Sequence, residues 1–270
     1  MSHKLLLNSK CYCYFLFIVL FSSSFSGCFS EQEILPEPYG VPGGLVLACL
    51  NSSHYTDLVI EIDYEVDQKP RPETLDLLID RINSVCEKQS VSYELSLTNF
   101  EHDGAWTSDD IRLKGRETRE TNAMNENQLR FHFMFPSGSH SESGVLGVAV
   151  DASTVMIFVD TIKEAENIIQ RPSWEDIEAA VTIHEFGHLV GLVNLVYTSN
   201  VDHEDPDHPG HSSNEDSVMY WAIESSDISN IIFGTLPNDF DNDDRGDLIK
   251  LNSQQLQANN QLWYPEDYSY

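Results

Sequence analysis

Two histidines four positions apart, His184 and His188, have the clearest capacity for chemistry in this chain, and Glu185 directly follows the first of them. On a helix, positions i and i+4 lie on one face, one turn apart, so both imidazoles can reach one metal ion. Zinc prefers such nitrogen ligands, at about 2.0–2.1 Å. Glu185 need not bind the metal itself, and its carboxylate can accept a proton from water that the metal activates.

A second segment downstream strengthens this interpretation. Its distinctive residues are His211, Ser212, Ser213, Met219 and Tyr220. With them the chain resembles the metzincin clan of zinc metallopeptidases, and within that clan it is most similar to the matrixins and archaemetzincins, which carry H-E-x-x-H-x-x-G-x-x-H followed by a Met-turn. The resemblance covers residues 173–221, with weaker support back to residue 144, and it implies a peptidase with one catalytic zinc ion.

The third zinc ligand is where the chain departs from the family pattern. Asn194 stands at the position of the last histidine of the motif, and asparagine is a poor zinc ligand beside histidine. The matching histidine, His211, comes only after an apparent insertion at residues 195–210. The resemblance therefore implies His211 as the third ligand, with His203, His208 and Asn194 as alternatives.

The resemblance also implies roles for residues that do not bind the metal. Glu185 would act as the general base, and Met219 would form an apolar floor beneath the metal. Archaemetzincins place cysteines where Ser212 and Ser217 stand here, so a second zinc ion of that kind is not expected.

An apolar segment upstream resembles the matrixin edge strand that pairs with extended substrate. Gly147, Val148 and Ala149 lie within it, and a peptide would add to it as a further strand. Matrixins often have a histidine here that binds a structural zinc ion, whereas this chain has Val148. The alternative is an ordinary buried edge strand.

Hydrophobic periodicity predicts the elements that must position these residues. We expect strands at 57–66, 91–97, 128–135, 144–150 and 153–161, and helices at 71–87, 107–121 and 174–192. Ser173 followed by Asp176 predicts a capping box at the start of the last helix. This order favours an α+β domain, and the resemblance makes it a metzincin-like zincin domain with a mixed twisted sheet, a long active-site helix and a loop-rich C-terminal part with the Met-turn.

The acidic segment 239–247 has carboxylates at alternate positions, as calcium loops do. It lacks the glycine of the sharp turn and the closing glutamate, so we favour an acidic helix start running into Leu248 and Leu251. The acids of the insertion at 195–210 are a second possible Ca²⁺ site, with a solvated acidic loop as the alternative.

The N-terminal residues predict export from the cytoplasm. Residues 1–27 read as a signal peptide, and small residues before Cys28 resemble a lipoprotein signal in which that cysteine becomes lipidated. Residues 28–50 would form a lipid-anchored tether and residues 51–270 the metallopeptidase catalytic domain. The location would then be extracellular, on the outer face of the cell membrane. An uncleaved anchor helix and plain secretion are the alternatives.

Two cysteines remain in the predicted mature domain, Cys49 and Cys86. Outside the cell such a pair suggests one disulfide, and two buried thiols are the alternative.

Charge limits the class of partner. The chain has 15 Lys and Arg residues against 44 Asp and Glu residues, a net charge of −29, which argues against nucleic acid as a partner. We expect a peptide or protein substrate, hydrolysed by a zinc-dependent endopeptidase, and a membrane contact through the N-terminal lipid or anchor. The rival hypotheses are a catalytically inactive zinc-stabilised adhesion module and a zinc hydrolase that acts on small amides.

Overall fold

The structure is a computed structural model that describes residues 40–165, 172–226, 228 and 235–259. The predicted signal peptide at 1–27, Cys28 and most of the tether lie outside the described residues. Within the described residues, no helix combines the length and the apolar character that crossing a membrane requires.

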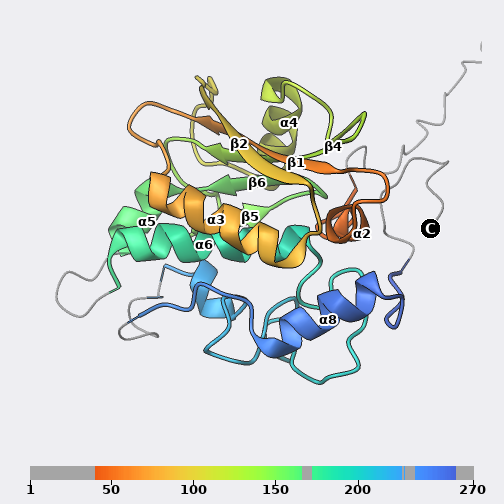
Figure 1. The fold of residues 1–270 in the computed structure, drawn as a ribbon. Coiled ribbons are helices and arrows are strands. Elements are labelled where there is room, and N and C mark those ends of the chain that lie inside the picture. Colours follow the sequence, from red (N-terminus) through yellow and green to blue (C-terminus); the bar gives the residue numbers. More distant parts are fainter. Residues whose placement is uncertain (1–39, 166–171, 227, 229–234, 260–270) are drawn as a thin grey trace, which may run out of the picture. The chain divides into compact units, whose positions relative to one another are not determined.

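A mixed sheet forms the centre of the fold, with the strand order β2-β1-β4-β6-β5 (Figure 1). The four strands β2 (Ser90–Leu97), β1 (Asp57–Tyr64), β4 (Gln128–Phe135) and β6 (Thr154–Ile157) run parallel, and β5 (Gly147–Ala149) pairs antiparallel with β6 at the edge. The short strand β3 (Met124–Asn125) pairs with the start of β4. The expected mixed sheet is therefore present, and β5 is one of its edges.

Helices cover both faces of this sheet (Figure 1). α3 (Pro72–Val85) and α6 (Trp174–Leu189) lie side by side on one face, and α4 (Ser108–Thr118) lies on the other. Strand β4 alternates between the two resulting cores, because successive side chains of a strand point to opposite faces. Phe131 and Phe133 pack in the larger core, beside α3 and α6, whereas Met134 packs in the smaller core.

The two ends of α6 are fixed by local chemistry. Ser173 and Asp176 form the expected capping box at its start. At its end Gly191 has φ +84°, and hydrogen bonds from Gly191 N to His188 O (3.0 Å) and from Leu192 N to Gly187 O (3.0 Å) close a Schellman motif. The helix therefore stops just after its second histidine and the chain turns away.

The C-terminal part contains little regular structure. It has the 3₁₀ helix η1 (Trp221–Glu224) and the helix α8 (Asn242–Asn252). In Figure 1, α8 lies below α6, on the side away from the sheet. The Asp241 side chain accepts hydrogen bonds from Asp243 N and Asp244 N, so it caps α8. The acidic segment is thus the helix start that the sequence favours, although Asp241 and Asp244 lie with His203 in a group of possible metal ligands.

Two predicted boundaries need correction. The strand expected at 153–161 ends at Ile157, and the chain enters the helix α5 (Val159–Ala165), whose one buried stripe is too short to show a period. The tether expected at 28–50 also overlaps the packed chain. Leu45 and the helix α2 (Val46–Leu50) belong to the larger core, because their apolar side chains are buried there.

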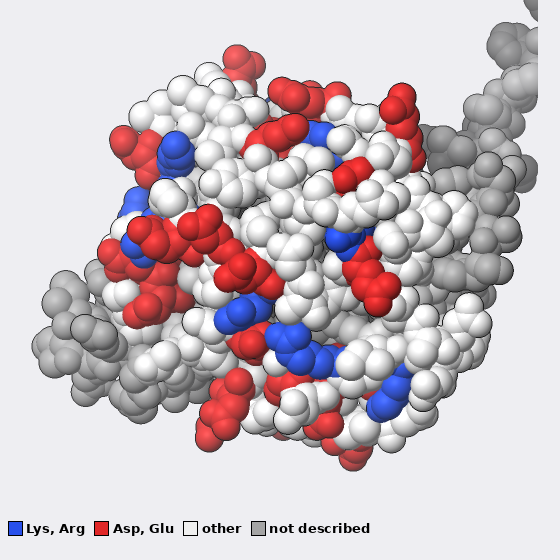
Figure 2. Space-filling view, viewed as in Figure 1, with Lys and Arg blue, Asp and Glu red and all other residues white. Residues whose placement is uncertain are grey.

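Acidic side chains are prominent on the surface. Figure 2 shows more Asp and Glu than Lys and Arg on the face it draws, with no broad basic patch among the described residues there. This distribution agrees with the negative net charge and gives a polyanion no complementary surface on this face.

Cys49 and Cys86 form a disulfide that ties α2 to the end of α3. Replacing both cysteines with alanine is expected to lower the free energy of unfolding by about 3–4 kcal/mol, because the bond joins positions 37 apart and restricts the unfolded chain. Denaturant unfolding gives the value, with reduced wild-type protein as the matched control. A double variant as stable as the oxidised wild type, or two reactive thiols in the native protein, would contradict this bond.

Candidate metal centre

His184 and His188 lie on one face of α6, and both imidazoles are held through their Nδ1 atoms. His184 Nδ1 lies 2.7 Å from Val218 O, and His188 Nδ1 lies 2.8 Å from Leu192 O. A carbonyl oxygen only accepts hydrogen bonds, so each Nδ1 carries the proton and each Nε2 carries a lone pair. Both rings are thus set in the tautomer that metal-binding histidines adopt.

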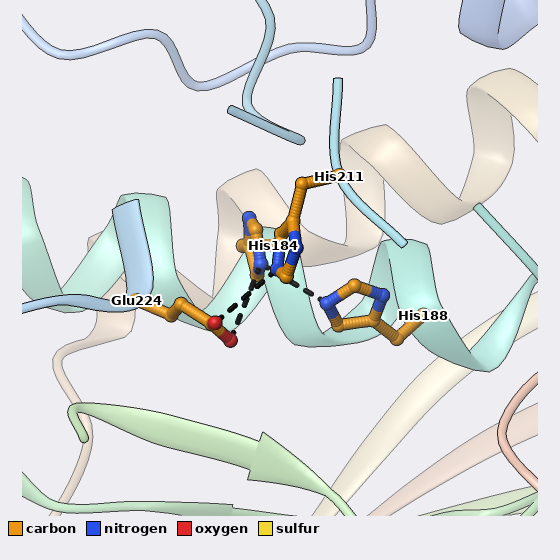
Figure 3. Close-up of side chains that lie close together, drawn as sticks. All are labelled: His184, His188, His211 and Glu224. Atoms are coloured by element: carbon orange, nitrogen blue, oxygen red, sulfur yellow. Dashed lines mark hydrogen bonds and ion pairs between the residues drawn. The ribbon is translucent and has the colours of Figure 1, made fainter. Parts of the chain in front are cut away.

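His211 brings a third imidazole to these two. Its ring centroid lies 5.2 Å from that of His184 and 5.1 Å from that of His188, while the rings of His184 and His188 are 4.7 Å apart. The three ring centroids are therefore nearly equidistant, and Figure 3 shows the rings close together. Each can offer one nitrogen within 4.8 Å of the others.

The insertion at 195–210 returns the chain to the helix end and so places His211. Val193 N donates to Gly210 O (3.0 Å), which closes the loop at its base. The Glu204 carboxylate then bridges the two ends, since Oε2 accepts from Asn194 Nδ2 (2.8 Å) and Oε1 accepts from Gly210 N (2.8 Å). His211 consequently lies beside the end of α6 despite the long insertion.

The three alternative ligands lie in other interactions. Asn194 has φ +58° and joins the loop clamp through Glu204. His203 is buried against α8, with Nε2 3.1 Å from Asp247 Oδ2. His208 pairs with Asp205 at 3.2 Å and stacks on the Trp221 ring. Of the four candidates, the structure brings only His211 into the group with His184 and His188.

The donor set fits a zinc ion. His184 Nε2 and His188 Nε2 face each other at 3.1 Å, each with a lone pair and no proton to share. Tetrahedral zinc with bonds of 2.0–2.1 Å would place its ligand atoms about 3.3–3.4 Å apart. The two lone pairs repel each other at this distance, and a cation between the two nitrogens would replace the repulsion with attraction to both.

Burial keeps His184 and His188 neutral, as metal binding requires, whereas at His211 burial is outweighed by the Glu224 carboxylate, which raises the pKa. Burial, reinforced by the neighbouring imidazoles His188 and His211, holds the pKa of His184 well below its usual value. Burial, with a further contribution from His211, lowers the pKa of His188 to about 4. Both rings are therefore unprotonated at neutral pH and ready to donate a lone pair.

Glu224 is a fourth member of the group that the sequence did not predict. Its Oε1 lies 3.2 Å from His211 Nε2, and its Oε2 lies 3.8 Å from His184 Nε2 (Figure 3). Although burial opposes ionisation, the three imidazoles, His211 foremost, lower the pKa of Glu224 to about 2. The only signal in the sequence is its place soon after Met219, because no spacing rule relates it to the histidines.

Glu185 lies in the same cavity. This cavity, of about 320 Å³, is lined by Glu185, His188, His211 and Glu224 together with residues of β5 and nearby loops. Both Glu185 oxygens are buried, and no described residue makes a well-formed hydrogen bond to them. Burial, and then repulsion by Glu224, raises the pKa of Glu185 well above its usual value, and the backbone of Ala149 opposes this shift.

The edge strand β5 lies directly against Glu185. A Cβ added at Gly147 would stand 2.8 Å from Glu185 Oε1 and 2.7 Å from Val181 Cγ1, so no side chain fits there without displacing the carboxylate. Val148 and Ala149 line the cavity next to it. Glycine at position 147 thus allows the strand to approach the helix.

Met219 lies beneath the histidine pair, in a turn closed by a hydrogen bond from Tyr220 N to Ser217 O (3.1 Å). A Cβ added at Gly187 would stand 2.2 Å from Met219 Sδ, so the thioether packs directly on the helix between the two histidines. The turn also connects the ligands, because Val218 O holds His184 and Met219 O accepts from Ser212 N (2.8 Å).

The packing of Met219 on Gly187 predicts an unusual response to alanine. In most helix interiors Gly→Ala gains up to about 1 kcal/mol. Gly187→Ala is instead expected to lower the free energy of unfolding by about 1–3 kcal/mol, because the new methyl group overlaps the thioether. Gly246→Ala in α8 is the matched control, since a Cβ there meets nothing within 4 Å. Denaturant unfolding measures both, and a stabilised Gly187→Ala variant would refute the close contact.

Comparisons with known proteins find similarity among solved structures alone. No family model matches the chain, and no curated protein matches it. Among solved structures it is similar to the archaemetzincin of Archaeoglobus fulgidus in complex with malonate, at 12% identity and a TM-score of 0.40, covering 70% of this chain and 98% of that one. It is also similar to the archaemetzincin of Methanopyrus kandleri, at 12% identity and a TM-score of 0.45, covering 74% and 96%. Likeness this distant assigns no role to any residue, and the resemblance to matrixins stays a prediction.

Proposed function

We propose that this protein is a zinc-dependent endopeptidase that hydrolyses peptide bonds of extracellular proteins. One observation carries the proposal: three imidazoles converge beside the buried carboxylate of Glu185, at the wall of a cavity. His184, His188 and His211 are the proposed metal ligands, each through Nε2. A purely structural metal site does not require a second carboxylate in the same cavity, and burying one without a well-formed hydrogen bond is unfavourable.

The chemistry divides between the metal and the protein. Zinc, when bound, supplies a Lewis acid that polarises a carbonyl and lowers the pKa of water. His184, His188 and His211 would hold the metal, and the Nδ1–H bonds of His184 and His188 to backbone carbonyls orient those two rings. Glu185 takes a proton from the attacking water at its carboxylate and returns it to the leaving amine. Met219 fixes the helix beneath the histidines and touches no substrate.

An extended peptide is the substrate that the cavity fits best. Val148 and Ala149 of β5 line it on one side, and β5 is the edge of the sheet. A peptide can add there as a further strand through backbone hydrogen bonds. Apolar groups of Val41, Pro42 and Leu195 line the remaining wall and would receive an apolar side chain of the substrate.

One observation favours a rival function. Glu224 completes a four-ligand set, and structural zinc sites are usually closed in this way. The chain could then be a zinc-stabilised binding or adhesion module without activity. Digestion of a broad peptide library, with and without chelator, decides between the two functions. Chelator-sensitive cleavage supports the peptidase, and a metal-loaded protein that cleaves neither peptides nor small amides supports the rival.

The cellular location is proposed from the sequence. Export by residues 1–27 and lipidation of Cys28 would place the catalytic domain on the outer face of the cell membrane. The Cys49–Cys86 disulfide is consistent with an oxidising compartment.

Glu185→Gln is expected to keep the metal and lose activity. The glutamine amide cannot accept the proton, so kcat should fall by about 10²–10⁴-fold. The three imidazoles are unchanged, so metal content should match that of the wild type. Metal analysis and peptide hydrolysis on the same preparation measure both. A fully active variant would remove Glu185 from the mechanism.

His211→Ala is expected to weaken zinc binding by more than about 100-fold, since loss of an outer-sphere partner alone typically weakens it 10–100-fold. His208→Ala is the matched control, because it lies on the same loop and outside the group. Competition with a chromophoric chelator measures both affinities. Equal affinities in the two variants would show that another residue supplies the third ligand.

A further inference from the structure

Glu224 presents a carboxylate where a catalytic centre would need an open position. It lies at the last residue of η1, in the chain that follows Met219. Its side chain is 36% exposed, whereas those of His184 and His211 are 0% and 12% exposed. Glu224 thus has a more exposed side chain than His184 and His211, and Figure 3 shows the four side chains close together.

Glu224 and His211 form an ion pair, which brings the carboxylate to the imidazole group even without a metal. Oε1 and Nε2 are 3.2 Å apart, yet Nε2 lacks hydrogen-bond geometry toward any described group. The separations within the group, 3.1, 3.2 and 3.8 Å, bracket the roughly 3.3–3.4 Å expected between neighbouring ligands of tetrahedral zinc. Carboxylate oxygen is an accepted zinc ligand at about 2.0–2.2 Å.

The backbone around Glu224 is anchored, so only its side chain is positioned to move. Glu224 O accepts from Leu146 N (3.0 Å), and Ser226 N donates to Gly144 O (2.8 Å), which pins this segment to the chain just before β5. The side chain reaches back from that anchor to the imidazoles and lines the cavity with Glu185. A rotation of the side chain toward solvent would uncover the fourth position without unfolding η1.

We propose that Glu224 is a displaceable fourth ligand of the metal, which closes the resting centre and withdraws when a metal-binding group of the substrate, such as the peptide carbonyl, binds. The proposal rests on the proposed function, since it needs a metal at His184, His188 and His211. It reconciles the complete four-ligand set with the unpaired carboxylate of Glu185, because the base acts only after Glu224 has left. A ligand that must displace Glu224 binds more weakly than it would bind an open centre. Its apparent Kd equals its intrinsic Kd divided by the fraction of centres that are open.

The test uses the full chain loaded with zinc or cobalt(II), and compares the wild type with Glu224→Gln and Glu224→Ala. Glu215→Gln is the matched control, because Glu215 is an exposed acid on the segment between His211 and Met219. Chelator competition gives zinc affinity, and the visible spectrum of the cobalt protein follows binding of acetohydroxamate, a small bidentate chelator.

Loss of a true ligand should weaken zinc binding by at least about tenfold in both Glu224 variants and leave the control unchanged. Acetohydroxamate should shift the cobalt spectrum of the wild type, and should bind the Glu224 variants at least about tenfold more tightly. The two variants guard against misfolding of either one.

Three results would overturn the proposal. Unchanged zinc and acetohydroxamate affinities in both variants would show that Glu224 is not a ligand, while the metal centre itself would stand. A wild-type spectrum that acetohydroxamate never shifts, beside a responsive variant, would make Glu224 a permanent ligand and favour the inactive module. A wild type that binds neither zinc nor cobalt would remove the proposed function and this proposal together.

Discussion

The opposed lone pairs of His184 and His188, 3.1 Å apart, are the constraint on which the rest of this site depends. Each ring is fixed because its Nδ1–H donates to a backbone carbonyl. This bond holds the ring orientation and keeps the proton on Nδ1, so Nε2 retains its lone pair. Those carbonyls belong to the chain after Gly191 and to the turn at Met219. The end of the helix and the following turn are therefore parts of the candidate metal centre, as much as the histidines are.

Carboxylates organise the surroundings of this centre by different means. Glu204 closes the insertion and so places His211, while Asp241 caps α8 and Asp247 receives His203 from the insertion. These acids are held by hydrogen bonds to backbone or side-chain groups. Glu185 and Glu224 differ, because they face the imidazoles across one cavity. The contrast separates acids that stabilise loops from the two acids that line the candidate metal centre.

Length and apolar content explain which elements the sequence could predict. The strands at 57–64 and 128–135 and the helix that carries His184 were expected within a few residues of their bounds, because each buries a long set of apolar side chains. The helix α5 was missed, since seven residues show too little of a period. The burial of 45–50 was missed because it depends on packing with distant segments.

The site was predictable where local geometry determines it and obscure where the tertiary fold does. Spacing alone relates His184 to His188, but His211 was inferred from family resemblance, since the clamp that returns the insertion cannot be read from the sequence. Glu224 reaches the group only after the chain has turned at Met219 and been pinned beside β5.

Diffraction from crystals grown with zinc, collected at energies on both sides of the zinc absorption edge, tests the central claim most directly. The account predicts one anomalous peak about 2.0–2.1 Å from Nε2 of His184, His188 and His211; no peak there, or a His211 ring turned away from it, would contradict it.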